Sequence, residues 1–349
     1  MDATTCDVAG DLRTLGMACT KMGSPFYGSL FEHAANAYER CRSIRALLDR
    51  HAHRARLGLL FAGAAHYRAL SGEAPRLAAH FPSTGGDGDA AAAWEAIEAD
   101  VLAHEGGYDD SFHLTVQTNE VARAFPLVGA MLAVHAVTGL SLRIFEIGSS
   151  AGFLLNLDRY RYSGAGWTWG DESSELELHL PQATRPEFFE GALPIVERRG
   201  CDLHPLDVRN PADANRLLSF IWPDQRERFD RVGQAIAVAR HFSPAVDRAN
   251  GVEWVARNAL PRAGTCTVVF HSVILEHLTA ADSVALQRAI AGLGRSASAQ
   301  SPFAHVRMES PTLGTGYETR VTLWPGERET LVARSDGHAQ RLQWMTQAA

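Results

Sequence analysis

The sequence predicts an all-helical domain followed by an α/β domain, which has a mostly parallel sheet and an antiparallel C-terminal hairpin. Apolar residues recur at helical spacing through the first part of the chain, and no convincing strand pattern interrupts them. Further along, short apolar runs rich in β-branched residues alternate with helical segments, as in parallel sheets. The expected boundaries are 1–139 for the helical domain and 140–349 for the α/β domain.

Helical spacing is clearest in an apolar stripe near the start of the chain, made of Leu30, Ala34, Ala37, Cys41, Ile44 and Leu48. Further helices are predicted at Leu57–Leu70, Ala90–His104 and Asn119–Thr138. The most apolar segment, Ala124–Leu142, contains Pro126 and His135 and is uninterrupted only over a short centre. It therefore predicts a buried helix rather than a membrane span.

The second half of the chain begins with a strand and then alternates between strands and helices. Strands are predicted at Leu140–Ile147, Ile195–Arg199, Thr265–Phe270 and Phe303–Met308. Helices are predicted at Pro211–Phe242, with a break at Trp222-Pro223, and at Ala280–Leu293. Two further strands, Tyr317–Leu323 and Thr330–Arg334, flank Pro325-Gly326, and this arrangement predicts the terminal hairpin.

Composition excludes several classes of protein. A formal charge of −7 argues against a general nucleic-acid binder, which normally has a basic face. Lys21 is the only lysine, so a phosphate-binding loop ending in Gly-Lys-Ser/Thr and the strand lysine of protein kinases are both absent. The cysteines are odd in number and never spaced as C-x-x-C, and no signal-peptide pattern opens the chain. We therefore expect a cytoplasmic protein without a disulfide framework.

Potential metal ligands do not group in the sequence. There is no H-E-x-x-H motif, and the side chains of His51 and His53 would point apart on a helix. We expect no metal, no nucleic-acid partner and no membrane partner. A small molecule is the expected substrate, and the sequence leaves a homodimer open.

The most informative segment follows the first predicted strand. It contains the small residues Gly148, Ser149, Ser150 and Gly152. Small side chains let the backbone approach a ligand closely. The first N–H groups of the helix predicted to follow would serve as donors to that ligand. Glu146 places a carboxylate at the end of the strand, which opposes a pyrophosphate but suits a cationic, amino-acid-bearing ligand such as S-adenosylmethionine. A tight strand-to-helix turn without a ligand is the alternative.

The same residues match G-x-S-x-G, the nucleophile elbow of α/β-hydrolases, with Ser150 as the nucleophile. His277, His305 or His338 would complete its triad. An elbow normally follows several strands and an oxyanion loop, whereas the residues upstream of Ser150 predict helices. A serine hydrolase is therefore an alternative rather than the leading hypothesis.

The chain resembles an uncharacterised bacterial family, a domain of unknown function with a class I methyltransferase-like core. The resemblance extends through nearly the whole chain and rests on Ser24–Tyr27, Val116–Val121, Glu146–Gly152, Leu157–Tyr162, Gly200–Val208, Ile221–Pro223 and Val268–Ser272. It implies a Rossmann-like class I methyltransferase sheet with S-adenosylmethionine as cofactor. The loop departs from the methyltransferase pattern because Ser150 replaces the middle glycine. The long gap after Gly152 holds Trp167–Asp171, a predicted inserted hairpin.

The resemblance also implies roles for individual residues. The methionine end of the cofactor would be held by Glu146, Gly148, Ser149, Ser150 and Gly152. Asp202 would accept hydrogen bonds from the ribose hydroxyls, with Asp207 as competitor, and turn or cap roles are the alternative for both. His271 and Ser272 close the fourth strand, where an open α/β sheet presents groups to its ligand, and a buried core histidine is the alternative there.

Catalytic and substrate-binding residues are predicted from the same segments. The base candidates are Tyr160, Glu276 and His277, and the substrate or lid candidates are Tyr27, Gln117, Asn119, Glu120 and Tyr162. Helix capping by Thr118 or Asn119 and core packing of the tyrosines are the alternatives. The leading hypothesis is S-adenosylmethionine-dependent methyl transfer to a small molecule under a helical lid. The others are cyclisation or elimination on S-adenosylmethionine itself, hydrolysis by Ser150, and ligand binding without catalysis.

Overall fold

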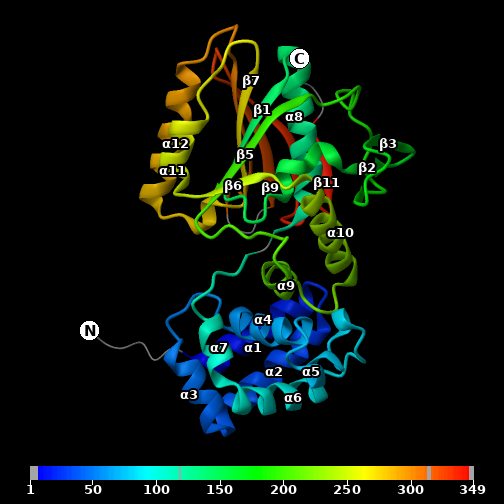
Figure 1. Cartoon of the computed structure of the whole chain (residues 1–349), viewed down its shortest axis with the longest axis vertical. Helices are drawn as coiled ribbons and strands as arrows, with labels where there is room; N and C mark the ends of the chain where they lie inside the picture. Colours follow the sequence, from blue (N-terminus) through cyan, green and yellow to red (C-terminus); the bar gives the residue numbers. More distant parts are fainter. Residues whose placement is uncertain (1–6, 118, 313–315, 346–349) are drawn as a thin grey trace. The chain divides into compact units, whose positions relative to one another are not determined.

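The computed structural model of the chain describes residues 7–117, 119–312 and 316–345 (Figure 1). The chain divides into two compact units. The helical unit comprises Met1–Thr118 and Arg209–Gly233, and the sheet unit comprises Asn119–Val208 and Gln234–Ala349. Each unit is therefore built from two separate stretches of the chain.

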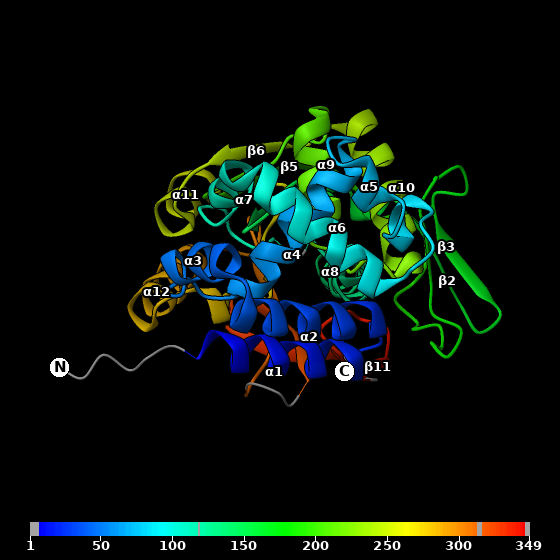
Figure 2. The same ribbon diagram turned by 90° about the horizontal axis from the view of Figure 1, so that it is seen from below.

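The helical unit contains α1 (Val8–Lys21), α2 (Pro25–Arg40), α3 (Arg42–Arg50), α4 (Leu57–Leu70), α5 (Pro75–Ala78), η1 (Pro82–Thr84), α6 (Ala90–Ala103), α7 (Glu105–Ser111), α9 (Pro211–Ser219) and the first part of α10 (Arg226–Phe242). The side chains of Asp7 and Asp89 accept hydrogen bonds from backbone N–H groups in the first turns of α1 and α6, which explains where these helices begin. α1 and α2 lie side by side (Figure 2). Gly16 permits their close approach, because a Cβ atom there would lie 2.9 Å from the carbonyl oxygen of Gly28.

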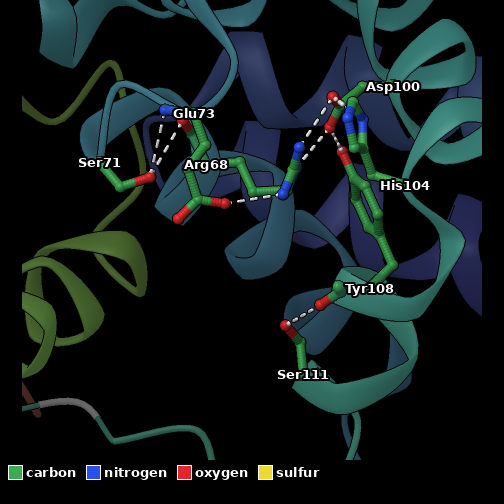
Figure 3. Close-up of polar contacts among 8 residues, drawn as sticks. Arg68, Ser71, Glu73, Asp100, His104, Tyr108 and Ser111 are labelled. Atoms are coloured by element: carbon green, nitrogen blue, oxygen red, sulfur yellow. Dashed lines mark hydrogen bonds and ion pairs between the residues drawn. The ribbon is translucent and has the colours of Figure 1, made fainter.

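A buried ion-pair network joins α4, α6 and α7 (Figure 3). Arg68 donates to both carboxylate oxygens of Asp100, from Nε at 2.6 Å and from Nη2 at 3.1 Å. Its Nη1 donates to Glu73 at 2.8 Å. The Tyr108 hydroxyl donates to Asp100 at 2.9 Å, and His104 Nδ1 lies 3.0 Å from the same carboxylate. Only 9% of the Arg68 side chain and 11% of the Asp100 side chain are exposed, so water screens this network weakly.

In the described part of the chain, the sheet unit contains an eight-stranded sheet in the order β11-β10-β9-β8-β7-β1-β5-β6. Its strands are β1 (Leu142–Ile147), β5 (Ile195–Asp202), β6 (Ala245–Arg248), β7 (Cys266–Ser272), β8 (Phe303–Glu309), β9 (Tyr317–Trp324), β10 (Arg328–Ser335) and β11 (Leu342–Trp344). The five neighbouring strands β6, β5, β1, β7 and β8 run parallel. β9, β10 and β11 extend the sheet beyond β8 with antiparallel pairing. The predicted α/β class, mostly parallel sheet and terminal hairpin are confirmed.

Helices cover both faces of this sheet. α11 (Gly251–Asn258) and α12 (Ala280–Arg295) lie on one face, and α8 (Ala124–Thr138) lies on the other (Figure 1). Phe145 and Ile147 of β1 pack with residues of α11 and α12, including Trp254 and Leu286. Because side chains alternate along a strand, Glu146 points to the opposite face.

The chain after β1 differs from the prediction. Instead of an α-helix, the loop leads into η3 (Phe153–Arg159), a 3-10 helix with a non-helical backbone at Asn156. Arg198 of β5 holds this segment by donating to the Leu155 carbonyl at 2.9 Å and pairing with Asp158 at 2.7 Å. Arg198 is next to Ile144 in the register of β5 with β1. Since Ile144 and Glu146 share a face of β1, η3 lies on the face that carries Glu146.

A smaller sheet follows η3 in the sequence. It has the order β3-β2-β4 and consists of β2 (Arg161–Gly164), β3 (Trp167–Gly170) and β4 (Glu177–His179). The inserted hairpin predicted around Trp167–Asp171 is present as the antiparallel pair β2–β3. The short elements β6, α11 and β11 are not predicted from the sequence, because each has too few residues to show a clear period.

Two segments lie in the unit opposite to the one predicted, so the boundaries 1–139 and 140–349 are wrong. α8 packs against β8, β9 and β10 of the sheet unit. It is buried on nearly all sides, and an all-round apolar helix does not indicate which layer it contacts. α9 belongs to the helical unit, where the ring of Phe220 lies close against Gly63 of α4.

α8 and the short helix η2 (Val121–Arg123) before it are apolar enough to cross a membrane by length and composition alone. Of the window Val121–Thr138, 67% is buried inside the protein. This burial is what the core helix of a globular domain shows, and it agrees with the buried helix predicted from the sequence.

Candidate functional site

The carboxyl ends of the parallel strands meet at one edge of the sheet. The chain passes from β1 to β5 on one side and returns to β7 on the other side of β1. In open α/β sheets, ligands bind outside the carboxyl ends of the strands where the strand order reverses in this way. The polar residues at this edge include Glu146, Ser149, Ser150, Asp202, Asp247, Arg248, His271, Ser272 and Glu309. The edge is therefore the candidate site.

The loop after β1 is bonded mainly to the protein itself. The N–H groups of Gly148 and Ser149 both donate to the Cys201 carbonyl, at 2.9 and 3.0 Å. The Ser150 N–H donates to Asp202 Oδ2 at 2.8 Å, and the Gly152 N–H donates to the Ser149 carbonyl at 2.7 Å. These four N–H groups are therefore used within the protein, and the donors predicted from the sequence, the first N–H groups of the following helix, remain a prediction. A phosphate could bind these N–H groups only by replacing the bonds that they already make within the protein.

Gly148 is required by the backbone and by its neighbour. Its φ of 75° lies in the left-handed region, and a Cβ atom there would be 2.6 Å from Cγ2 of Ile274. Ile274 follows β7, so this contact joins the loops after β1 and β7. A larger side chain at Gly148 would displace Ile274 and strain the backbone whether or not a ligand binds there.

Glu146 is buried at the end of β1, and 2% of the residue is exposed. Its Oε2 has no hydrogen-bond partner among the residues that the structure describes. Burial raises the pKa of this carboxyl well above its usual range; a hydrogen bond from Ser149 acts in the opposite direction, and the charge of Asp202 adds to the rise. A buried carboxyl with an unbonded oxygen beside a second carboxylate is suited to a cation.

Asp202 lies at the end of β5, on the same face as Glu146 by register. Its carboxylate accepts hydrogen bonds from Ser150 N–H and His204 N–H, both at 2.8 Å. These are turn contacts that anchor the loop after β1, as in the alternative interpretation from the sequence. Asp207 is exposed on the loop beyond.

His271 and Ser272 lie on opposite faces of the sheet. His271 is on the α11–α12 face, because its side-chain direction matches that of Val269. Its Nδ1 donates to the Glu309 carboxylate at 2.7 Å, and its Nε2 lies 3.0 Å from Nε2 of His305. Burial lowers the pKa of His305 well below its usual value. His271 therefore does not face Glu146, whereas Ser272 does.

Of the three predicted bases, Tyr160 is buried, whereas Glu276 and His277 are exposed. The Tyr160 hydroxyl donates to the Phe153 carbonyl, and burial raises the Tyr160 pKa well above its usual value. The Tyr162 hydroxyl donates to the Leu157 carbonyl at 2.6 Å. Both tyrosines thus hold η3 in place, which argues against Tyr160 as a base and Tyr162 as a substrate contact.

The other two base candidates follow β7 at the candidate edge. Glu276 and His277 lie on η4 (Leu275–His277), and their side chains are 3.4 Å apart at Oε1 and Nε2. Both residues are exposed. Their position leaves them as ionisable groups at the rim of the candidate site.

The predicted substrate residues are divided between the two units. Tyr27 is buried in the core of the helical unit, where its ring contacts Phe31 and Trp222. Gln117 also belongs to the helical unit. Asn119 and Glu120 belong to the sheet unit and precede η2.

The helix cap expected at Thr118 or Asn119 belongs to the next residue. The Glu120 carboxylate accepts from Ala122 N–H at 3.2 Å and caps η2. Asn119 is not this cap, and Thr118 lies outside the described residues. The Asn119 Nδ2 atom is buried and has no partner within the described ranges.

Sequence reasoning did not single out Asn156. It lies on η3, is completely buried, and has no described partner for either its Oδ1 or its Nδ2 atom. The signal available in the sequence is a lone amide within the apolar run Phe153–Leu157. Such a residue ordinarily indicates either a buried hydrogen-bond network or a ligand contact.

For the hydrolase alternative, the backbone of Ser150 has a suitable conformation, but the buried histidines His271 and His305 do not form a catalytic triad with it. Ser150 has a φ of 51°, consistent with the strained turn of a nucleophile elbow. The Nε2 atoms of His271 and His305 face each other. His277 is exposed beside Glu276, and His338 lies between β10 and β11 at the antiparallel edge.

Within residues 7–117, 119–312 and 316–345, no group of three or more His, Cys, Asp or Glu side chains is placed to hold a metal ion. The candidate site is therefore described by its carboxyls, hydroxyls and amides. Its two buried groups without described partners, Glu146 and Asn156, lie on the same side of the sheet.

No curated protein and no solved structure matches the chain. One family model matches residues 9–344, which is nearly the whole chain. This match supports the resemblance to an uncharacterised bacterial family noted from the sequence motifs. The chain belongs to the family described as "Uncharacterized protein conserved in bacteria (DUF2332)".

Proposed function

We propose that the sheet unit binds S-adenosylmethionine at the carboxyl ends of β1, β5 and β7 and transfers its methyl group to a small molecule. One contrast carries the proposal. The loop N–H groups of Gly148, Ser149 and Ser150 are bonded to the protein, whereas the Glu146 carboxyl is buried with an unbonded oxygen in the described structure. Such a site disfavours phosphate and favours a cation.

The topology supports the same proposal. The order β6-β5-β1-β7-β8 corresponds to the order 3-2-1-4-5 of doubly wound nucleotide-binding sheets. The resemblance to class I methyltransferases implies a Rossmann-like sheet, and this strand order supports that part of the proposal. β9 and β10 depart from simple repetition because they continue as an antiparallel meander at the edge.

The residues of the site would act mainly by binding and positioning. A bound sulfonium cofactor would supply the reactive methyl group. Glu146 would pair with the positive charge of the cofactor, and Ile274 would cover the loop at Gly148 and exclude water. Methyl transfer by in-line displacement needs alignment more than acid–base chemistry. Where the acceptor carries a proton, Glu276 or His277 at the rim would accept it.

We expect S-adenosylmethionine to bind with a micromolar Kd, about −8 kcal/mol. Isothermal titration calorimetry measures this, with S-adenosylhomocysteine as the product analogue and NAD as a phosphate-bearing control. NAD should not bind, because the N–H groups of Gly148, Ser149, Ser150 and Gly152 are bonded within the protein. Binding of NAD without binding of S-adenosylmethionine would contradict the proposal. If S-adenosylmethionine binds, mass spectrometry of the protein incubated with it and with candidate acceptors distinguishes methyl transfer to an acceptor from conversion of the cofactor itself.

The left-handed backbone of Ser150 keeps the hydrolase as a second candidate, and a probe separates the two. We expect no covalent labelling of the protein by a fluorophosphonate, because the Nε2 atoms of His271 and His305 face each other. The Ser150→Ala variant is the control for any label that appears. Stoichiometric modification of wild type that disappears in this variant would favour the hydrolase.

A further inference from the structure

We propose that Asn156 is a recognition residue of this site and that, together with Glu146, it binds the α-amino-acid end of the ligand. Glu146 and the Asn156 Oδ1 atom would accept from the ligand's ammonium group, and Asn156 Nδ2 would donate to its carboxylate. This assignment rests on the proposed function, because it names the part of S-adenosylmethionine that these two residues hold.

The first observation is the burial of Asn156 without partners. None of the residue's surface is exposed, and neither amide atom has a hydrogen-bond partner in the part of the chain that the structure describes. The surrounding residues Phe153, Leu154, Leu155 and Leu157 are buried and apolar. An amide in such surroundings destabilises the fold unless something bonds to it.

The second observation is that the backbone around Asn156 is held in place. The hydroxyls of Tyr160 and Tyr162 donate to the carbonyls of Phe153 and Leu157, one on each side of Asn156. Arg198 donates to the carbonyl of Leu155. The non-helical conformation at Asn156 is therefore fixed by its neighbours, with φ of −102° and ψ of 17°. A residue held in this way is preorganised for a contact.

The third observation places Asn156 on the side of the sheet that carries Glu146. Phe145 and Ile147 point to the α11–α12 face, so Glu146 points to the face where η3 lies. Arg198, on this same face, contacts η3 directly. The charge of Glu146 also contributes to the raised pKa of Tyr160 at the end of η3. Glu146 and Asn156 therefore share one region of the sheet unit.

The chemistry of the two side chains selects the ligand group. A carboxamide offers one acceptor and one donor, and the carboxylate of Glu146 adds negative charge. An α-amino acid presents an ammonium donor next to a carboxylate acceptor, which matches this set. Asn119 adds a further buried Nδ2 with no described partner, and it lies just before Glu120, the cap of η2, which packs against η3. A phosphate or an uncharged ring would leave Glu146 unpaired.

The test compares Asn156→Leu, which keeps the number and branching of the side-chain heavy atoms, with a matched control. Asn258 of α11 is bonded at both amide atoms, to the Trp254 carbonyl at 2.8 Å and to Arg199 at 3.0 Å. We expect Asn156→Leu to raise the thermal unfolding midpoint of the protein without ligand by about 2–4 °C, because it removes a buried unpaired amide. Asn258→Leu should lower the midpoint, because it removes satisfied bonds.

Binding is measured with S-adenosylmethionine and with its decarboxylated form, which lacks the ligand carboxylate. Wild type should bind S-adenosylmethionine at least about tenfold more tightly than the decarboxylated form. Asn156→Leu should weaken S-adenosylmethionine by about tenfold or more and the decarboxylated form by less. Asn258→Leu should bind both ligands as wild type does.

Two results would overturn the assignment. A lower unfolding midpoint for Asn156→Leu would make this residue part of the fold's own hydrogen bonding. Equal affinities of wild type for the two ligands would show that no group recognises the carboxylate. Failure of wild type to bind S-adenosylmethionine at all would defeat the proposed function separately. In that case a raised midpoint for Asn156→Leu would still support an amide kept unpaired for a ligand.

Discussion

Replacing Glu146 with glutamine is expected to weaken S-adenosylmethionine binding by about 100-fold or more. Glu146 is buried at the end of β1, and removing one member of a buried charge pair costs about 3–5 kcal/mol. Each 1.4 kcal/mol corresponds to about tenfold in Kd. Titration calorimetry of Glu146→Gln measures the loss. The matched control is Glu253→Gln on α11, where 70% of the side chain is exposed. A Glu146→Gln variant that binds like wild type would remove this carboxyl from the site.

The same substitution should change the dependence of stability on pH. Burial raises the pKa of Glu146 well above the ordinary glutamate value of 4.5, so the folded state holds this proton at pH values where the unfolded state has lost it. The contribution to stability is therefore full below about pH 4.5 and is lost as pH rises through the raised pKa. Urea unfolding across this window should show a weaker decline for Glu146→Gln than for wild type. Parallel curves would contradict the assigned burial effect.

The second large effect concerns the network of Arg68 and Asp100 in the helical unit. Arg68→Met should lower the free energy of unfolding by about 3–5 kcal/mol, because the buried Asp100 carboxylate loses both bonds from the guanidinium. Urea or guanidinium unfolding followed by circular dichroism measures the loss. Arg257→Met is the control, since its pair with Glu253 is exposed and contributes about 0–1 kcal/mol. Equal losses in the two variants would show that burial does not strengthen the Arg68 pair.

The sequence predicted the candidate edge because its signals are local. A short β-branched strand ending at Gly148 locates β1, and the left-handed φ of Gly148 explains why a glycine stands there. The bonds that occupy the loop come from Cys201 and Asp202, about fifty residues further along the chain. No local pattern indicates such contacts. The sequence therefore predicts the strand and the glycine turn, but not the bonds that occupy the N–H groups of Gly148, Ser149 and Ser150.

The misplaced elements have a similar cause. α8 is apolar on nearly every side, and this pattern shows burial without naming the neighbour. α9 has an ordinary amphipathic pattern, and only the contact of Phe220 with Gly63 reveals the unit to which it belongs. Asn156 was missed because a single amide in an apolar run has no period. Its significance depends on the absence of described partners, which only three-dimensional contacts reveal.

The division of the helical unit into two stretches has a consequence for synthesis on the ribosome. Met1–Thr118 emerges first, but Arg209–Gly233 is translated only after β1 and β5 of the other unit. At about 5–20 residues per second, the first stretch waits for several seconds before α9 can cover Gly63 of α4. During that interval its apolar surface is open to chaperones. A recombinant fragment that stops at the end of the first stretch would keep this surface exposed permanently, so soluble expression of the unit requires joining both stretches in one chain.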